Sequence, residues 1–146
     1  MKMKIQKITP FLWFESGAEE AAKYYTTVFK NSKIISSHPM VTTLELEGLQ
    51  IMILNGGPHF KLNESFSLYI SCENQEEIDY FWNKLTSDGG KESMCGWLVD
   101  KYGVSWQVVP AVLGKLMSNP EKSGKVMEAF MKMKKFDIKK LEEAGA

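Results

Sequence analysis

The sequence is poor in the residues that most often ligate metals or form disulfide frameworks. It contains two histidines, His38 and His59, and two cysteines, Cys72 and Cys95, with no CxxC motif. So few cysteines argue against a secreted domain that is held together by disulfides. We therefore expect the chain to work in a reducing cytoplasm.

Segments that would direct the chain to a membrane or out of the cell are also missing. The apolar segment 8–14 is too short for a signal peptide, contains Pro10 and runs into Glu15. No apolar run approaches the roughly 18 to 20 residues that a membrane-spanning helix needs. We therefore predict no membrane partner.

An excess of charge of either sign is absent as well. Eighteen basic side chains balance 18 acidic ones, so no global field draws the chain to a polyanion. Six lysines do gather near the carboxyl end, at Lys125, Lys132, Lys134, Lys135, Lys139 and Lys140. They are interleaved with acidic residues and stand opposite an apolar stripe, which is typical of a solvated helix face. No nucleic-acid partner is expected.

What the sequence does contain is a repeated pattern. A capping-box motif at 16–19, followed by an apolar stripe, predicts a helix over 17–30. A similar start and stripe predict a second helix over 75–88. The two stripes superpose, with Ala21 matching Ile78, which indicates that the chain consists of two related halves.

Each predicted helix follows one strand and precedes three. The predicted strands cover 7–14, 33–38, 41–47 and 49–54, and then 65–72, 91–95, 97–100 and 104–109. The fold class is therefore α+β, with two tandem βαβββ modules. We expect one domain over 1–146, made of module one (about 5–55), a turn-rich connector (56–64), module two (about 65–110) and a helical tail (111–146).

The hairpin at 96–110 is the most informative segment of the chain. Strand-forming residues on both sides of a turn that contains Asp100 and Gly103 predict a tight antiparallel pair. Side chains alternate along a strand, so one face of the second strand carries Val104, Trp106 and Val108. This apolar face should pack under a helix. The opposite face, with Ser105, Gln107 and Val109, should line a concave surface.

Six segments of the chain resemble a known family: 8–14, 20–25, 56–58, 79–85, 95–110 and 131–141. The chain looks like the PhnB-like branch of the vicinal-oxygen-chelate (glyoxalase/bleomycin-resistance/dioxygenase) superfamily, often labelled as 3-demethylubiquinone-9 3-methyltransferase domain proteins. The resemblance implies an open, barrel-like mixed sheet around a ligand cavity, commonly in a homodimer. Three methionines of the tail could adapt to such a partner copy, namely Met127, Met131 and Met133.

Metal-using members of this superfamily place His or Glu ligands on the first and last strands of each module. In this chain the last-strand positions hold Met52 and Gln107, and the first-strand positions fall near Thr9 or Pro10 and near Phe66 or Ser67. A thioether and a neutral amide do not offer the hard oxygen or basic nitrogen that a catalytic divalent ion requires. We therefore predict that the chain holds no metal and no cofactor.

Aromatic and sulfur-containing side chains could instead wall an apolar cavity for an organic ligand. The candidate ligand-binding residues are Trp13, Met40, Met52, Met94, Trp97 and Gln107. For Trp13 and Trp97, packing in the interior is an open alternative. Gln107 must find a hydrogen-bond partner in the protein or in a ligand, because its amide lies on an inward face.

Three other pairs suit structural roles better than catalysis. They are His59 with Glu64, Cys72 with Cys95, and Asp100 with Lys101. The first pair should lie in a surface loop and the third in an exposed turn. The two thiols should be buried and inert, since no histidine is close in sequence to activate them.

Two classes of function follow from these residues. The first is a metal-free protein that binds a small organic molecule, as bleomycin-resistance relatives do. The second is an enzyme, either a metal-dependent glyoxalase- or dioxygenase-like one with atypical ligands such as His59, Glu45 or Glu64, or one that acts by polar groups alone. The methyltransferase activity named by the family label is disfavoured, because the sequence lacks the glycine-rich loop and the strand–helix alternation of an adenosyl-donor site. We expect binding rather than catalysis.

Overall fold

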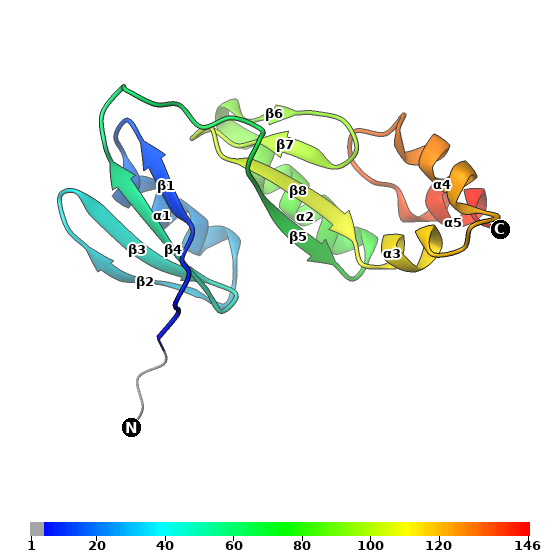
Figure 1. Ribbon diagram of the computed structural model, residues 1–146, viewed down its shortest axis with the longest axis horizontal. Coiled ribbons are helices and arrows are strands. Elements are labelled where there is room, and N and C mark those ends of the chain that lie inside the picture. Colours follow the sequence, from blue (N-terminus) through cyan, green and yellow to red (C-terminus); the bar gives the residue numbers. More distant parts are fainter. Residues whose placement is uncertain (1–4) are drawn as a thin grey trace. The chain divides into compact units, whose positions relative to one another are not determined.

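The computed structural model describes residues 5–146, which divide into two compact units, one ending at Leu62 and one covering Asn63–Ala146. Each unit contains a four-stranded mixed sheet, and the second unit also carries the helical tail (Figure 1). The predicted α+β class, with two tandem βαβββ modules followed by helices, is confirmed. No helix within residues 5–146 is long and apolar enough to cross a membrane.

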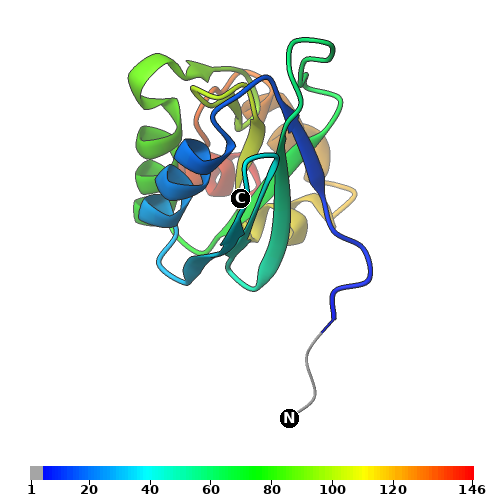
Figure 2. The ribbon, with the colours of Figure 1, turned by 90° about the vertical axis from the view of Figure 1, so that its left-hand side faces the viewer.

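The first unit places one helix on one face of its sheet. Its elements are β1 (Phe11–Phe14), α1 (Ala18–Val28), β2 (Ser32–Ser37), β3 (Val41–Leu46) and β4 (Leu49–Asn55). The strand order is β1-β4-β3-β2, in which β1 runs parallel to β4 and the other pairs are antiparallel. Figure 2 shows α1 lying across the sheet. Because α1 connects β1 to β2 at the opposite edge, it crosses the whole sheet.

The core of the first unit lies between α1 and this covered face. The buried side of the helix carries Ala18, Ala21, Ala22, Tyr25 and Val28. Small alanine side chains let the helix approach the sheet, where Leu12, Leu44 and Ile53 are buried as well. Each such aliphatic side chain contributes roughly 1.5–3 kcal/mol when it leaves water.

Two details of the first unit differ from the sequence prediction. The capping-box prediction at 16–19 is wrong: the helix begins after Gly17 without a side-chain cap, and Asn55 Oδ1 accepts from the Ala18 N–H at 2.9 Å instead. Strand β1 begins at Phe11 rather than at residue 7. Before it, the Gln6 side chain binds both backbone groups of Gln50, so a side-chain amide replaces strand pairing there.

The second unit repeats the topology of the first. Its elements are β5 (Ser67–Cys72), α2 (Gln75–Thr86), the 3-10 turn η1 (Ser87–Gly89), β6 (Lys91–Glu92), β7 (Trp97–Val99) and β8 (Ser105–Pro110). The order β5-β8-β7-β6 matches that of the first sheet, again with one parallel pair. Asn74 caps α2 through Oδ1, which accepts from the Glu77 N–H at 2.8 Å. Strand β6 is shorter than predicted, because Cys95 adopts a left-handed conformation (φ 57°) that ends the extended run.

The core of the second unit lies between α2 and the apolar face of the hairpin. Helix α2 buries Ile78, Phe81, Trp82 and Leu85. Opposite them, Leu98, Trp106 and Val108 are buried, as the alternation along β8 predicts. The two tryptophans that were expected in the core, Trp82 and Trp106, are both in it.

The Asp100 side chain stabilises the β7–β8 hairpin. The expectation that Asp100 lies in an exposed turn is wrong. The residue is only 3% exposed. Its Oδ1 accepts from the Tyr102 and Val104 backbone N–H groups at 2.8 and 3.1 Å, and its Oδ2 accepts from Trp106 Nε1 at 2.8 Å. Hydrogen bonds to both oxygens offset the cost of burying the carboxylate. Neighbouring Lys101 instead forms an ion pair with Asp88 at 3.9 Å.

The tail folds onto the second unit. It consists of α3 (Val112–Met117), α4 (Ser123–Phe130) and α5 (Ile138–Ala144), with Val126, Phe136 and Leu141 buried. The Gln75 side chain donates to Phe136 O and accepts from the Ile138 N–H, both at 2.9 Å. One side-chain amide of α2 thus bonds the tail in two directions, and Lys135 of the tail adds an ion pair to Asp79 of the same helix at 2.8 Å.

Replacing Asp100 tests the hairpin. We expect Asp100→Asn to lower the free energy of unfolding by about 1–3 kcal/mol, because its amide NH₂ would face the Trp106 indole N–H, donor against donor. Urea unfolding followed by tryptophan fluorescence measures the change. Asp88→Asn is the matched control, since Asp88 lies in a turn with 79% of its side chain exposed, and it should change stability by less than about 0.5 kcal/mol. Equal effects of the two substitutions would contradict this account.

Gly96 tests the attachment of the tail. Its φ of 80° is left-handed, and an added Cβ would lie 2.4 Å from the Phe136 ring. Gly103 has a similar φ of 87° with no atom within 4 Å of that position. We expect Gly103→Ala to cost about 1–2 kcal/mol from backbone strain alone, and Gly96→Ala to cost about 1–3 kcal/mol more from overpacking. Hydrogen exchange should show faster exchange over 131–141 only in the Gly96 variant.

Candidate functional site

The uncovered face of each sheet carries the candidate site residues. Within each unit the helix packs on one face only, so every second residue of each strand points to the other face. In the first unit these residues include Trp13 and Met52, and in the second they include Trp97 and Gln107. Period-two alternation therefore separates the core of each unit from the surface on which a ligand could lie.

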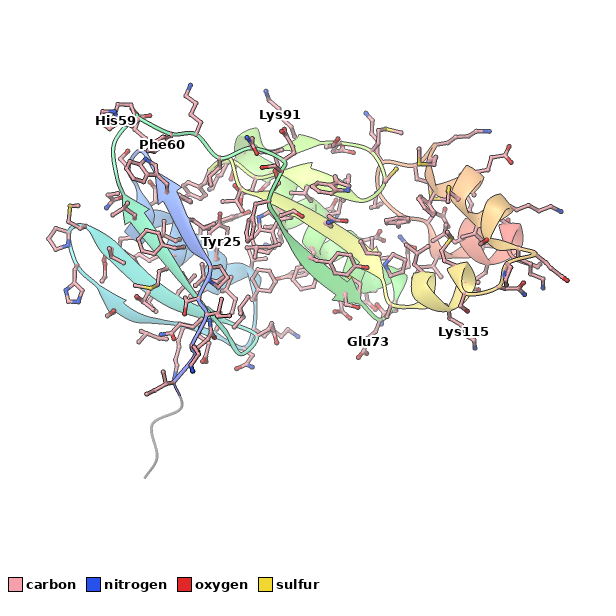
Figure 3. All side chains as sticks on the ribbon, viewed as in Figure 1. Tyr25, His59, Phe60, Glu73, Lys91 and Lys115 are labelled. Atoms are coloured by element: carbon pink, nitrogen blue, oxygen red, sulfur yellow. The ribbon has the colours of Figure 1, made fainter. Side chains whose placement is uncertain are left out.

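Trp13 and Met52 lie on neighbouring strands of the first sheet. Met52 is in register with Phe11, and Trp13 is in register with Leu54. Trp13 is also held by its own loop, because its Nε1 donates to Gly57 O at 2.9 Å and the Phe60 ring packs edge-on at 5.0 Å. Figure 3 shows Phe60 beside His59 in the loop that follows β4. Trp13 is thus a fixed aromatic platform.

Met40 stands apart from these two residues in the chain. It lies in the turn between β2 and β3 and is 61% exposed, and its carbonyl accepts from the Asn55 N–H at 2.8 Å. Its backbone therefore supports the end of β4.

A row of three side chains crosses the second sheet. Trp97, Gln107 and Tyr69 are in register on β7, β8 and β5, so they lie side by side on the uncovered face. Gln107 Nε2 donates to Ser67 Oγ at 3.0 Å. Gln107 and Ser67 stand at the strand positions where metal-using members of the superfamily were expected to carry ligands. In this chain a neutral hydrogen bond joins them.

Ser105 lies two residues before Gln107 on the same face. The residue is 2% exposed. Among the side chains of residues 5–146, its Oγ is the one buried oxygen or nitrogen atom that has no hydrogen-bond partner. Such a group costs about 1–3 kcal/mol when it is left unsatisfied.

A pocket of about 310 Å³ adjoins this row. It is lined by Glu64, Ser93, Met94, Cys95, Trp97, Leu98 and Val99. Met94 and Trp97, two of the residues that were expected to bind a ligand, therefore share one pocket. The mixed lining suits an organic molecule with a polar substituent.

The uncovered faces hold no obvious site for a hard metal ion. Among residues 5–146 there is no group of three or more His, Cys, Asp or Glu side chains that could hold one. His59 and Glu64 are exposed, as was expected for a surface loop. Thr9 Oγ1 accepts from Gln6 Nε2 at 3.3 Å and so serves the segment before β1.

The two thiols have different environments. Cys72 is fully buried at the end of β5, where desolvation and the nearby charge of Glu77 raise its pKa to about 12. It therefore stays protonated at neutral pH and is a poor nucleophile. The expectation of a buried thiol is wrong for Cys95, which is only partly buried in the loop between β6 and β7.

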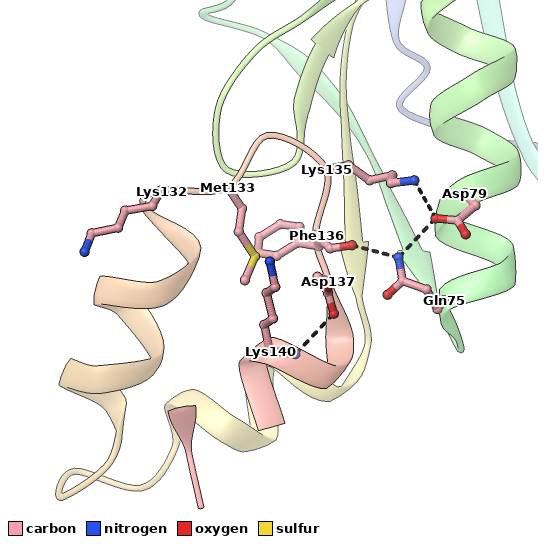
Figure 4. Close-up of a pocket in the computed structure, with 8 residues that line it drawn as sticks. All are labelled: Gln75, Asp79, Lys132, Met133, Lys135, Phe136, Asp137 and Lys140. Carbon is pink, nitrogen blue, oxygen red and sulfur yellow. Dashed lines mark hydrogen bonds and ion pairs between the residues drawn. The ribbon is translucent and has the colours of Figure 1, made fainter. Parts of the chain in front are cut away.

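A second pocket lies between α2 and the tail, away from the predicted site residues (Figure 4). It measures about 480 Å³ and is lined by Gln75, Asp79, Lys132, Met133, Lys135, Phe136, Asp137 and Lys140. Hydrogen bonds from Lys135, at 2.8 Å, and from Gln75, at 3.1 Å, lower the pKa of Asp79. Sequence reasoning missed this cluster, because it treated Lys135 only as part of a solvated face.

Comparison with known proteins identifies the family. The sequence profile of the 3-demethylubiquinone-9 3-methyltransferase family matches residues 6–109. A PhnB protein from Bacillus cereus is 37% identical, with a TM-score of 0.66, and the match covers 73% of this chain and 100% of that one. Curated protein sequences give no match.

Two other solved structures share the fold at lower identity. A protein from Pseudomonas aeruginosa is 20% identical with a TM-score of 0.59, over 73% of this chain and 98% of that one. The fosfomycin resistance protein FosX from Listeria monocytogenes is 14% identical with a TM-score of 0.55, over 75% and 92%. The chain belongs to the 3-demethylubiquinone-9 3-methyltransferase family, which includes the PhnB protein from Bacillus cereus.

Proposed function

We propose that the chain binds a small organic molecule on the uncovered face of its second sheet, without a divalent metal. The observation that carries this proposal is the row of Trp97, Gln107 and Tyr69 beside the pocket that Trp97 shares with Met94. A flat apolar wall next to a few polar groups is the usual composition of a small-molecule site.

The polar groups of this face define the ligand class. Gln107 uses its Nε2 in the bond to Ser67, so its amide oxygen can accept a hydrogen bond from a ligand. A ligand with an aromatic or alicyclic body and one hydroxyl, amide or amine group would donate to this oxygen while it stacks on Trp97.

The first sheet offers a second surface of related composition. Trp13, Met52 and Phe11 lie together on its uncovered face, with the indole fixed by Gly57. This face is suited to bind an apolar group independently of the second sheet, because an aromatic ring and an adaptable thioether tolerate many shapes. Met40 enters this proposal only as an exposed side chain at the nearby end of β3. A homodimer and a cytoplasmic location stay predictions.

A metal-dependent enzyme is the alternative function. FosX from Listeria monocytogenes has been crystallised in complex with Mn(II) and a sulfate ion, but it is only 17% identical to this chain in that structure, with a TM-score of 0.50. Such a likeness concerns the fold, and function depends on the residues of the site. In this chain the matched strand positions carry Met52 and Gln107, which are poor ligands for Mn(II).

Native mass spectrometry combined with elemental analysis of freshly purified protein tests the proposal. We expect less than one-tenth of an equivalent of Mn, Fe, Ni or Zn per chain, and a retained organic molecule or a vacant site that binds members of a fragment library. One tightly held divalent ion per chain, with binding lost on chelation, would show instead that the enzyme alternative holds.

Substitution of Gln107 locates the binding site. Fragments found by ligand-observed NMR should shift the backbone amide signals of Trp97, Tyr69 and Gln107. Gln107→Leu should weaken binding about tenfold or more, because loss of one buried hydrogen bond costs about 1–3 kcal/mol. Asn83→Leu is the matched control, because it removes an amide from the exposed side of α2. Fragments that bind equally well to both variants would contradict the proposed site.

A further inference from the structure

Two sulfur atoms from distant parts of the second unit lie together. Cys95 Sγ in the loop between β6 and β7 is 3.8 Å from Met131 Sδ at the end of α4. Met131 is 57% exposed, and Cys95 is only partly buried, so an ion in solution can reach both atoms. Cys95 also lines the pocket that adjoins the ligand row, whereas Met131 lines neither that pocket nor the pocket beside Asp79.

Backbone hydrogen bonds fix the segments that carry this pair. The Cys95 N–H donates to Met133 O at 2.7 Å, and the Gly96 N–H donates to Lys134 O at 2.8 Å. The Met131 N–H continues the α4 helix by donating to Met127 O at 2.9 Å. Both sulfur-bearing backbones are therefore positioned before any ligand arrives, which lowers the entropic cost of binding one.

The separation of the two sulfurs suits a shared metal ion. With a metal–sulfur bond of about 2.3 Å, a 3.8 Å sulfur–sulfur separation corresponds to an S–metal–S angle of about 110°. This angle fits three- or four-coordinate geometry rather than a linear two-coordinate one, so at least one further donor is needed. Two exposed thioethers adjoin the pair in sequence, since Met94 precedes Cys95 and Met127 lies one helical turn before Met131.

The donor set selects the kind of ion. Thiolate and thioether sulfur are soft ligands, which favour Cu(I) over the hard ions that prefer oxygen. We propose that Cys95 and Met131 are the central ligands of a Cu(I) site, completed by Met94 or Met127. On binding, the Cys95 thiol releases its proton to solvent and forms a thiolate–copper bond, with no change in the oxidation state of either atom.

Competition titration with Cu(I) tests this site in the full chain. Cu(I) is delivered under argon as its bicinchoninate complex, and we expect one equivalent to transfer to the wild-type protein. Cys95→Ser and Met131→Leu should each weaken Cu(I) binding by about tenfold or more. X-ray absorption of the loaded protein should show three sulfur scatterers at about 2.3 Å.

Matched variants separate this site from other sulfur atoms. Met133→Leu removes a thioether that lines the pocket beside Asp79, and Cys72→Ala removes the buried thiol. Neither should change Cu(I) affinity more than about twofold, with circular dichroism to confirm that each variant is folded. If Met131→Leu bound Cu(I) as tightly as the wild type, Met131 would not be a ligand, and the proposal would be overturned. Gln107→Leu should leave Cu(I) binding unchanged, so this result stands apart from the test of the organic ligand.

Discussion

Each four-stranded sheet is packed against one helix between its first two strands, on one face only. This constraint decides which residues of each strand lie in the core under the helix. Side chains alternate along a strand, so covering one face forces every second residue to the uncovered face. Strand β8 shows the result, with Trp106 and Val108 in the core under α2 and Gln107 on the other side bonded to Ser67. A core position and a position of the proposed ligand site thus alternate along the same short segment.

The parts of the fold that depend on periodicity could be predicted from the sequence. The apolar stripes of α1 and α2 fix which helix residues are buried, because burial there is decided by spacing along one element. Alternation along β8 predicts the burial of Trp106 and Val108 but not that of Ser105 and Val109, which are each 2% exposed on the opposite face. The cap of α1 could not be predicted. Asn55 reaches the Ala18 N–H from the end of another strand, and nothing in the local sequence marks that contact.

Asp100 illustrates a second limit of prediction from sequence. An aspartate beside a lysine in a glycine-containing turn is usually solvated. Here the turn folds back so that two backbone N–H groups and the Trp106 indole surround the carboxylate. Among the site residues, the row of Trp97 and Gln107 follows from strand alternation. The cluster of Gln75, Asp79 and Lys135 does not, because it joins segments that are far apart in the chain.

The contrast between the two thiols limits the covalent chemistry that this chain can undergo. With the pKa of Cys72 near 12 and its side chain fully buried, mild oxidants and alkylating reagents meet a single addressable sulfhydryl, Cys95. Oxidative cross-linking between molecules must then stop at covalent pairs and cannot extend into polymers. The same asymmetry allows one reporter group to be attached per molecule without genetic removal of the other cysteine.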